Sequence, residues 1–100
     1  MTKPTYELTL RKTYYDKGFF NLGVAVDRFV RKDSGPARLS LGESRSTIPV
    51  RVNREANLNG TPRIMGGESL RNWLQRNCRE GEVVVEILSP AEYWLRQQEA

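Results

Sequence analysis

The chain has 100 residues, of which 38% are hydrophobic and 28% charged, a composition typical of one soluble globular domain with a modest core. It holds one cysteine and no histidine, which excludes disulfide bonds within the chain, histidine-dependent catalytic triads and zinc sites that need histidine. Because no catalytic set of side chains is recognisable, we expect a protein that is not an enzyme and needs no metal or other cofactor. No apolar stretch predicts a signal peptide or a membrane span, so we expect a cytoplasmic or nuclear location and no membrane partner.

Positive charge is concentrated in the first part of the chain, although the net charge is only +4. Residues 1–63 contain twelve Lys and Arg against six Asp and Glu, whereas residues 64–100 contain four against six. Clustered cations favour a polyanionic partner, because each neutralised phosphate releases bound counterions. A moderately basic protein with no such partner is an equally good interpretation of the charge alone.

Alternation of apolar and polar residues predicts five strands, at residues 6–11, 22–26, 37–41, 47–53 and 82–88. Pro49 has no N–H for a sheet, so its strand should lie at an edge or turn Pro49 away from a partner. The last strand, "EVVVEIL", is the most apolar, and we expect it to be covered on both faces. The side chains expected to face the core are Tyr6, Leu8, Leu10, Leu22, Val24, Val26, Leu39, Leu41, Ile48, Val50, Val52, Val83, Val85 and Ile87.

One segment, "GGESLRNWLQRN" at residues 66–77, has clear helical spacing, with Gly67 or Ser69 as its N-cap. The periodic positions are Leu70, Trp73, Leu74 and Asn77. We also expect a short helix or turn over residues 27–31, and a C-terminal helix over residues 90–100 that starts at Ser89 and Pro90 and frays at its end. These elements predict a single domain, residues 1–100, of mostly-β (α+β) class with one or two short helices, folded as a small barrel or sandwich.

Two polar segments interrupt this pattern, "RKTYYDKGFF" at residues 11–20 and "VNREANLNGTPRIMGG" at residues 52–67. Arginine can donate two parallel hydrogen bonds to guanine, and asparagine can pair with adenine. We therefore expect the second segment to read bases through Arg54, Asn57, Asn59 and Arg63. Lysines and hydroxyls more often hold phosphates, which predicts this role for Lys12, Thr13, Lys17 and Thr61. Two plainer interpretations stay open: "NLNG" is also an ordinary turn sequence, and the tyrosine pair at residues 14–15 also fits simple packing.

The order of these elements resembles the DNA-binding pseudobarrel family, which comprises the plant B-three transcription-factor domains and the recognition domains of certain bacterial restriction endonucleases. The resemblance rests on "FFNLGVAVDRFV", a strand running into a short helix, and on "TIPVRVN" before the second polar segment. It continues in "GGESLRNWLQRN" followed by "CREGEVVVEIL". The chain departs from the family pattern where Val26 and Asp27 replace Ile-Pro, and where Gly81 and Glu82 replace Gly-Asp. The tryptophan expected directly after a glycine is matched in role by Trp73 instead.

The resemblance implies a small open pseudobarrel of the seven-stranded type that binds double-stranded DNA sequence-specifically. Its two arms, residues 11–17 and 54–63, would grip the major groove. The resemblance adds Arg11 and Tyr14 to the base-reading residues and Arg51 to the phosphate contacts. Domains of this kind serve transcription regulation or restriction–modification, so a partner nuclease or regulatory domain is expected.

Two other functions fit the same composition. A small barrel with exposed aromatic and basic residues also binds single-stranded nucleic acid, by stacking bases on side chains such as Tyr14, Tyr15 and Phe19. The second alternative is a non-enzymatic protein-interaction module, in which the basic arms meet an acidic partner or the apolar C-terminal segment docks to another subunit.

Overall fold

The structure is a computed structural model that describes residues 3–78 and 82–97 of the chain. Its elements are, in chain order, β1 (Thr5–Thr9), α1 (Lys12–Lys17), β2 (Phe19–Asn21), α2 (Val24–Asp27), β3 (Gly35–Leu41), β4 (Ser46–Asn53), β5 (Arg63–Met65), α3 (Gly67–Asn77), β6 (Glu82–Ser89) and β7 (Glu92–Gln97). Strands dominate, which confirms the mostly-β class. Three short helices accompany them in this part of the chain, where one or two were expected. No helix among the described residues is long and apolar enough to span a membrane.

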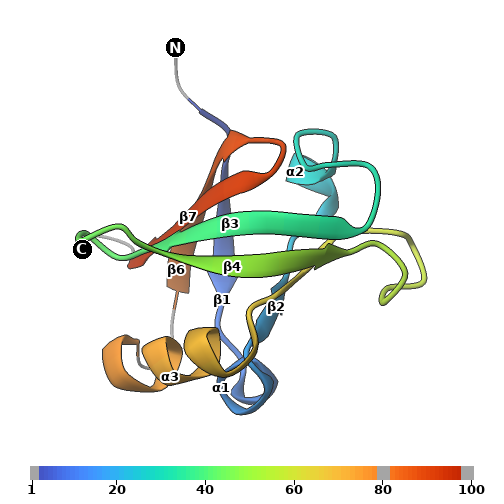
Figure 1. Cartoon of the computed structure of the whole chain (residues 1–100). Coiled ribbons are helices and arrows are strands. Elements are labelled where there is room, and N and C mark those ends of the chain that lie inside the picture. The colour runs from blue at the N-terminus through green and yellow to red at the C-terminus, as the bar shows by residue number, and fades with distance from the viewer. Residues whose placement is uncertain (1–2, 79–81, 98–100) are drawn as a thin grey trace.

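All seven strands form one sheet, in the order β1-β6-β7-β3-β4-β5-β2, which curls into a half-barrel (Figure 1). Neighbouring strands are antiparallel except β3 and β7, which pair in parallel. β1 and β2 stand at the two ends of this order. The curl brings these ends together. Gly23, just after β2, lies so close to β1 that a Cβ added to it would be 2.7 Å from the hydroxyl oxygen of Tyr6. We call the opening between β1 and β2 the seam.

The core fills the inside of the half-barrel, and most of it comes from the alternating positions that the sequence predicts. Tyr6 and Ile48 pack against this core while half-buried. Pro49 lies opposite Arg38 of β3. On the other side of β4, β5 pairs only with residues 51–53, so no strand lies beside Pro49 there. Pro49 is thus turned away from a partner strand, as expected. The predicted inward side chains that are buried are Leu8, Leu10, Leu22, Val26, Leu39, Leu41, Val50, Val52, Val83, Val85 and Ile87.

The helix α3 closes one end of the half-barrel (Figure 1). Leu70 and Leu74 are buried in the core, and Trp73 packs against its margin. The helix was predicted correctly, but its N-cap is Gly66 and neither of the two expected residues. Gly81, part of the family-like signature before β6, lies outside the described residues.

The prediction of a strand over residues 22–26 is wrong. β2 ends at Asn21, and α2 begins at Val24, whose side chain is 74% exposed. Leu22 and Val26 are both buried. Because they are four residues apart, their spacing fits one side of a helical turn as well as a strand.

Two further segments differ from their predicted conformation. Residues 12–17, expected to be a polar loop, form the helix α1, which buries Tyr14 and ends at Gly18. Residues 92–97, expected to be helical, form β7 between β6 and β3, with Tyr93 and Leu95 buried. Residues 98–100 of that expected helix lie outside the described residues. The Ser-Pro pair that resembled a helix start instead lies at the junction of β6 and β7, since such residues favour turns as well.

Gly18 holds α1 against the start of α3 through a close approach of two backbones. Its carbonyl oxygen accepts hydrogen bonds from the N–H groups of Gly66 (2.9 Å) and Gly67 (3.0 Å). Its φ is 73°, and a Cβ at this position would lie 2.1 Å from the carbonyl oxygen of Gly67. Glycine is therefore required here by both conformation and space.

We expect Gly18→Ala to lower the free energy of unfolding by about 3 to 4 kcal/mol, because it adds a backbone clash to a left-handed conformation. Gly67→Ala is the matched control, since its φ is 63° but no atom beyond its chain neighbours and the backbone of its own helix lies within 4 Å of its Cβ position. Only the conformational cost of about 1 to 2 kcal/mol should remain there. Urea denaturation measures both variants, and equal losses would contradict the tight contact at Gly18.

Candidate nucleic-acid interface

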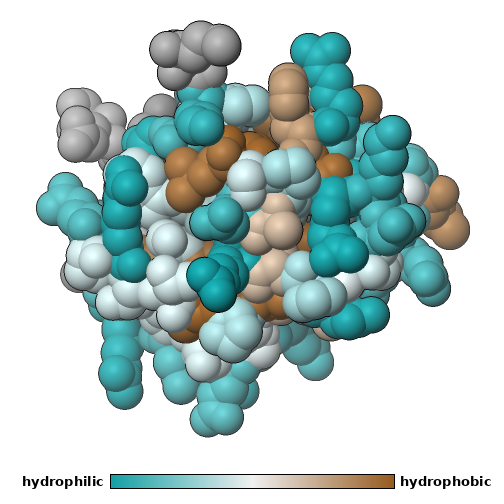
Figure 2. Space-filling model, turned by 45° about the horizontal axis from the view of Figure 1, so that its top comes forward, coloured by the Kyte–Doolittle hydropathy of each residue, from teal (hydrophilic) through white to brown (hydrophobic). Residues whose placement is uncertain are grey.

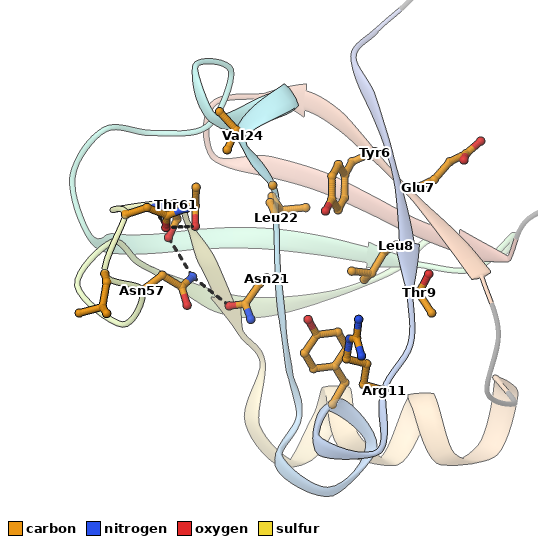
Figure 3. A pocket seen from close by; sticks show the side chains of 14 residues that line it. Tyr6, Glu7, Leu8, Thr9, Arg11, Asn21, Leu22, Val24, Asn57 and Thr61 are labelled. Atoms are coloured by element: carbon orange, nitrogen blue, oxygen red, sulfur yellow. Dashed lines mark hydrogen bonds between the residues drawn. The ribbon is translucent and has the colours of Figure 1, made fainter.

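The seam is hollowed into an open pocket of about 600 Å³ (Figure 3). Tyr6, Leu8 and Thr9 of β1 line one side, and Asn21 and Leu22 line the other. The loop between β4 and β5, residues 54–62, forms part of the rim and is called the β4–β5 loop below. The pocket brings both predicted polar segments to one place, since its lining also includes Arg11, Tyr14, Asn57, Asn59 and Thr61.

Arg54 fastens the β4–β5 loop to the chain around α2, and its side chain is only 14% exposed. Nε donates to the carbonyl oxygen of Arg31 (2.9 Å), and Nη2 donates to those of Asp27 (3.0 Å) and Val30 (3.0 Å). Nη1 donates to the carbonyl oxygen of Gly60 (3.2 Å) and to the carboxylate of Asp27, which completes an ion pair. All five N–H donors of the guanidinium therefore have acceptors within the protein.

These contacts give Arg54 a structural role in place of the base-reading role expected from its type. Three of its acceptors are carbonyl oxygens at the end of α2 (Asp27) and in the turn that follows it (Val30 and Arg31). The backbone N–H of Arg54 is also held, by the hydroxyl of Ser34 at 2.8 Å. No donor of Arg54 is left over for a base edge.

Asn57, Asn21 and Arg63 form a hydrogen-bonded cluster beside the seam, and Figure 3 shows the contact between Asn57 and Asn21. Asn57 Nδ2 donates to Asn21 Oδ1 and to the carbonyl oxygen of Thr61, both at 3.1 Å. Asn57 Oδ1 accepts from Arg63 Nη2 (3.4 Å), and Arg63 Nε donates to Asn21 Oδ1 (3.0 Å). The amide of Asn57 is thus engaged at both ends. Within the described part of the chain, Asn21 Nδ2 and Arg63 Nη1 have no hydrogen-bond partner.

The "NLNG" stretch, residues 57–60, is a turn, as the plainer interpretation held. The N–H of Gly60, whose φ is 76°, donates to the carbonyl oxygen of Asn57 at 3.0 Å. Asn59 Oδ1 accepts from the N–H (3.2 Å) and the hydroxyl (2.8 Å) of Thr61. Thr61 is buried and its hydroxyl donates to Asn59, so it does not have the exposure that the expected phosphate contact requires. Asn59 itself is exposed.

The first polar segment contributes cations to the surface but not the expected aromatic side chain. Tyr14 is buried and packs edge-on against Phe19, with 5.4 Å between the ring centroids, so its base-reading role is not available. The ring of Phe19 is also covered by Arg63, whose guanidinium carbon lies 4.3 Å from the centre of that ring. The exposed residues of the segment are Arg11, Lys12, Thr13, Asp16 and Lys17.

The polar surface continues from the rim onto the outer face of the sheet. Cross-strand pairing places Asn53, Arg63 and Asn21 in one row across β4, β5 and β2. The next row on the same face consists of Arg51, Met65 and Phe19. Arg51 is exposed, as its predicted phosphate contact requires.

The site as a whole presents mainly hydrogen-bond donors, namely Asn21, Asn59 and Arg63, with exposed cations nearby. Donors match the acceptor atoms of base edges in the major groove and the oxygens of phosphates. Asn21 was not predicted from the sequence. Its partners Asn57 and Arg63 are 36 and 42 residues away along the chain, so no local pattern could identify it.

Within residues 3–78 and 82–97, no group of three or more His, Cys, Asp and Glu side chains is placed to hold a metal ion. No protein-family model matches the sequence, and no curated protein is significantly similar to it.

We expect Arg54→Ala to lower the free energy of unfolding by about 2 to 4 kcal/mol, because it leaves the Asp27 carboxylate and several carbonyl oxygens without their donor. Arg54→Lys should restore only part of this loss, since an ammonium cannot reproduce the planar fork. Chemical denaturation measures both variants.

Arg51→Ala removes an exposed arginine from the neighbouring strand β4 and serves as the control, with an expected change within about 0.5 kcal/mol. If Arg54→Ala and Arg51→Ala had the same small effect, Arg54 would not be the anchor of the loop.

Proposed function

We propose that this protein is a sequence-specific double-stranded DNA-binding domain, and that its half-barrel is a DNA-binding pseudobarrel. The β4–β5 loop and the cations around α1 grip the major groove from the two sides of the seam. One observation carries the proposal: a loop held in place by Arg54 presents the exposed Asn59, whose amide donors have no partner among the described residues, in the same pocket lining as Asn21 and Arg11.

A fixed loop with free donors suits recognition of a surface rich in acceptors. Its conformation is already set by the contacts of Arg54 and Asn57, so binding loses little conformational entropy. The major groove offers acceptors on every base pair, and the phosphates on either side attract the cations. Both features of the site are thus complementary to duplex DNA.

The hydrogen bonds within the site support a division of roles among its residues. Arg63 keeps both hydrogens of Nη1 and one of Nη2 for the O6 and N7 atoms of a guanine. Asn21 and Asn59 use their oxygens internally, so they can only donate to a base. Contacts to phosphates fall to the exposed cations, which are Arg11, Lys12, Lys17 and Arg51.

Duplex DNA is favoured over single strands because the aromatic side chains of the first segment offer little free surface for stacking: Phe20 is buried, and Tyr15 packs half-buried against the core. Tyr14 is buried, and Arg63 covers one face of Phe19. Binding of single strands without sequence preference depends on exposed aromatic platforms. A protein-interaction module remains the competing function, and its binding would survive high salt.

The direct test is selection from a pool of random duplex DNA by the purified chain at near-physiological salt, followed by sequencing. We expect enrichment of a short motif, and weaker retention of single strands of the same sequence. Retention that is equal for all sequences would reduce the site to a basic surface. No retention at all would contradict DNA binding and favour the protein-interaction module.

Substitutions should separate base reading from phosphate contact on the enriched motif. We expect Arg63→Ala to cost about 1 to 3 kcal/mol and to relax the preference at one base pair. Lys12→Ala should weaken specific and random duplexes alike and reduce the slope of log K against log salt by about 1. Fluorescence anisotropy at several salt concentrations measures both, and circular dichroism confirms folding. Equal effects of the two variants on specific and random DNA would overturn this division of roles.

A further inference from the structure

We infer that Leu58 and Asn59, adjacent at the tip of the β4–β5 loop, form a thymine reader that recognises the 5-methyl group and the O4 atom of one thymine together. This inference rests on the proposed function and names one base that the loop selects.

Leu58 is presented to solvent on a loop that is otherwise tightly held. Its relative exposure is 110%, so it is as accessible to solvent as a leucine in an extended peptide. Gly60 and Asn57, on either side of the loop tip, are anchored to Arg54 and to the Asn21 cluster. A leucine in this position adds nothing to the core, and its apolar surface is available to a partner.

Exposed large hydrophobic side chains gather around this site. Hydrophilic side chains cover most of the face drawn in Figure 2, with hydrophobic ones reaching the surface between them. Among the described residues, the exposed large hydrophobic side chains are Val24, Leu58 and Met65. Val24 and Leu58 line the seam, and Met65 lies in the row of side chains next to Arg63. The candidate DNA-binding surface therefore combines donors with apolar groups.

The orientation of the Asn59 amide follows from its partners. Its Oδ1 faces the backbone N–H of Thr61, which can only donate, so this atom has to be the oxygen. The amide nitrogen consequently points away from Thr61, and within the described residues it has no acceptor. Asn59 therefore presents donors alone and cannot form the two-sided pair with adenine, which needs a donor and an acceptor.

An apolar group beside a donor is complementary to one base among the four. In the major groove, thymine shows an O4 acceptor next to its 5-methyl group, whereas cytosine shows an N4 donor and no methyl. Guanine and adenine have no methyl group for Leu58 to contact. Leu58 and Asn59 thus match thymine through its 5-methyl group and its O4 atom. Each of these two contacts can be removed without the other.

The experiment uses the duplex enriched by selection, with each thymine replaced in turn by uracil, which lacks only the methyl group. At the position that responds, the T·A pair is then compared with U·A, C·G and 5-methylcytosine·G. Dissociation constants are measured by fluorescence anisotropy for the wild type, Leu58→Ala and Asn59→Asp. The last variant keeps an acceptor for Thr61 but replaces the outward donor by an acceptor.

For the wild type we expect uracil to weaken binding about 3- to 5-fold at one position, the value of one buried methyl group. The 5-methylcytosine pair should weaken it by about 5-fold or more, because a donor then faces a donor. Leu58→Ala should bind the thymine and uracil duplexes equally. Asn59→Asp should keep the methyl effect but lose the preference for thymine over 5-methylcytosine.

Three outcomes would overturn the thymine reader while leaving DNA binding intact: an enriched motif without thymine, no uracil effect at any position, or unchanged ratios in both variants. Failure of the wild type to bind any duplex is a different result, since it would reject the proposed function together with this inference.

Discussion

The guanidinium of Arg54 is the contact on which the candidate site depends most. It joins the β4–β5 loop at Gly60 to α2 at Asp27 and to the backbone that follows at Val30 and Arg31. A loop rich in asparagine and glycine would otherwise sample many conformations, and binding would have to order it. Because the planar fork of arginine supplies five donors in fixed directions, one side chain can hold segments that are distant in the sequence.

The anchored β4–β5 loop lies beside the seam, where the two edge strands of the sheet, β1 and β2, approach each other. Unpaired sheet edges invite association with other chains, and short edge strands reduce that risk. Here the edge strands have five and three residues, and Tyr6 of β1 packs closely on Gly23 across the seam. The opening is thus shielded from strand pairing yet lined by polar side chains from both predicted segments. On the β1 side of the seam, Gly18 fixes α1 through its backbone contacts with Gly66 and Gly67. The cations of the first segment therefore also have a defined position.

Local patterns were sufficient for elements whose signal lies within the element itself. The alternation in β1, β3, β4 and β6 and the helical spacing of α3 predicted those elements correctly. β7 was missed because it is specified by pairing with both β6 and β3, whereas the Ser-Pro pair just before it resembles a helix N-terminus. Both polar segments were predicted as parts of the site, and they meet at the seam. Roles within them were harder to predict, because Arg54 and Asn57 have the chemistry of base readers but bond to distant Asp27 and Asn21.

In the proposed complex with DNA, the seam and its β4–β5 loop form the binding surface. Titration of the ¹⁵N-labelled protein with the enriched duplex, followed by NMR, tests it residue by residue. We predict the largest shifts for the side-chain amides of Asn59 and Asn21 and for the backbone amides of residues 11–17 and 57–61. The turn between β3 and β4, residues 42–45, lies at the opposite end of β4 and should not respond (Figure 1). Shifts concentrated at that turn and at the nearby indoles of Trp73 and Trp94, with none at Asn59, would contradict DNA binding at the seam.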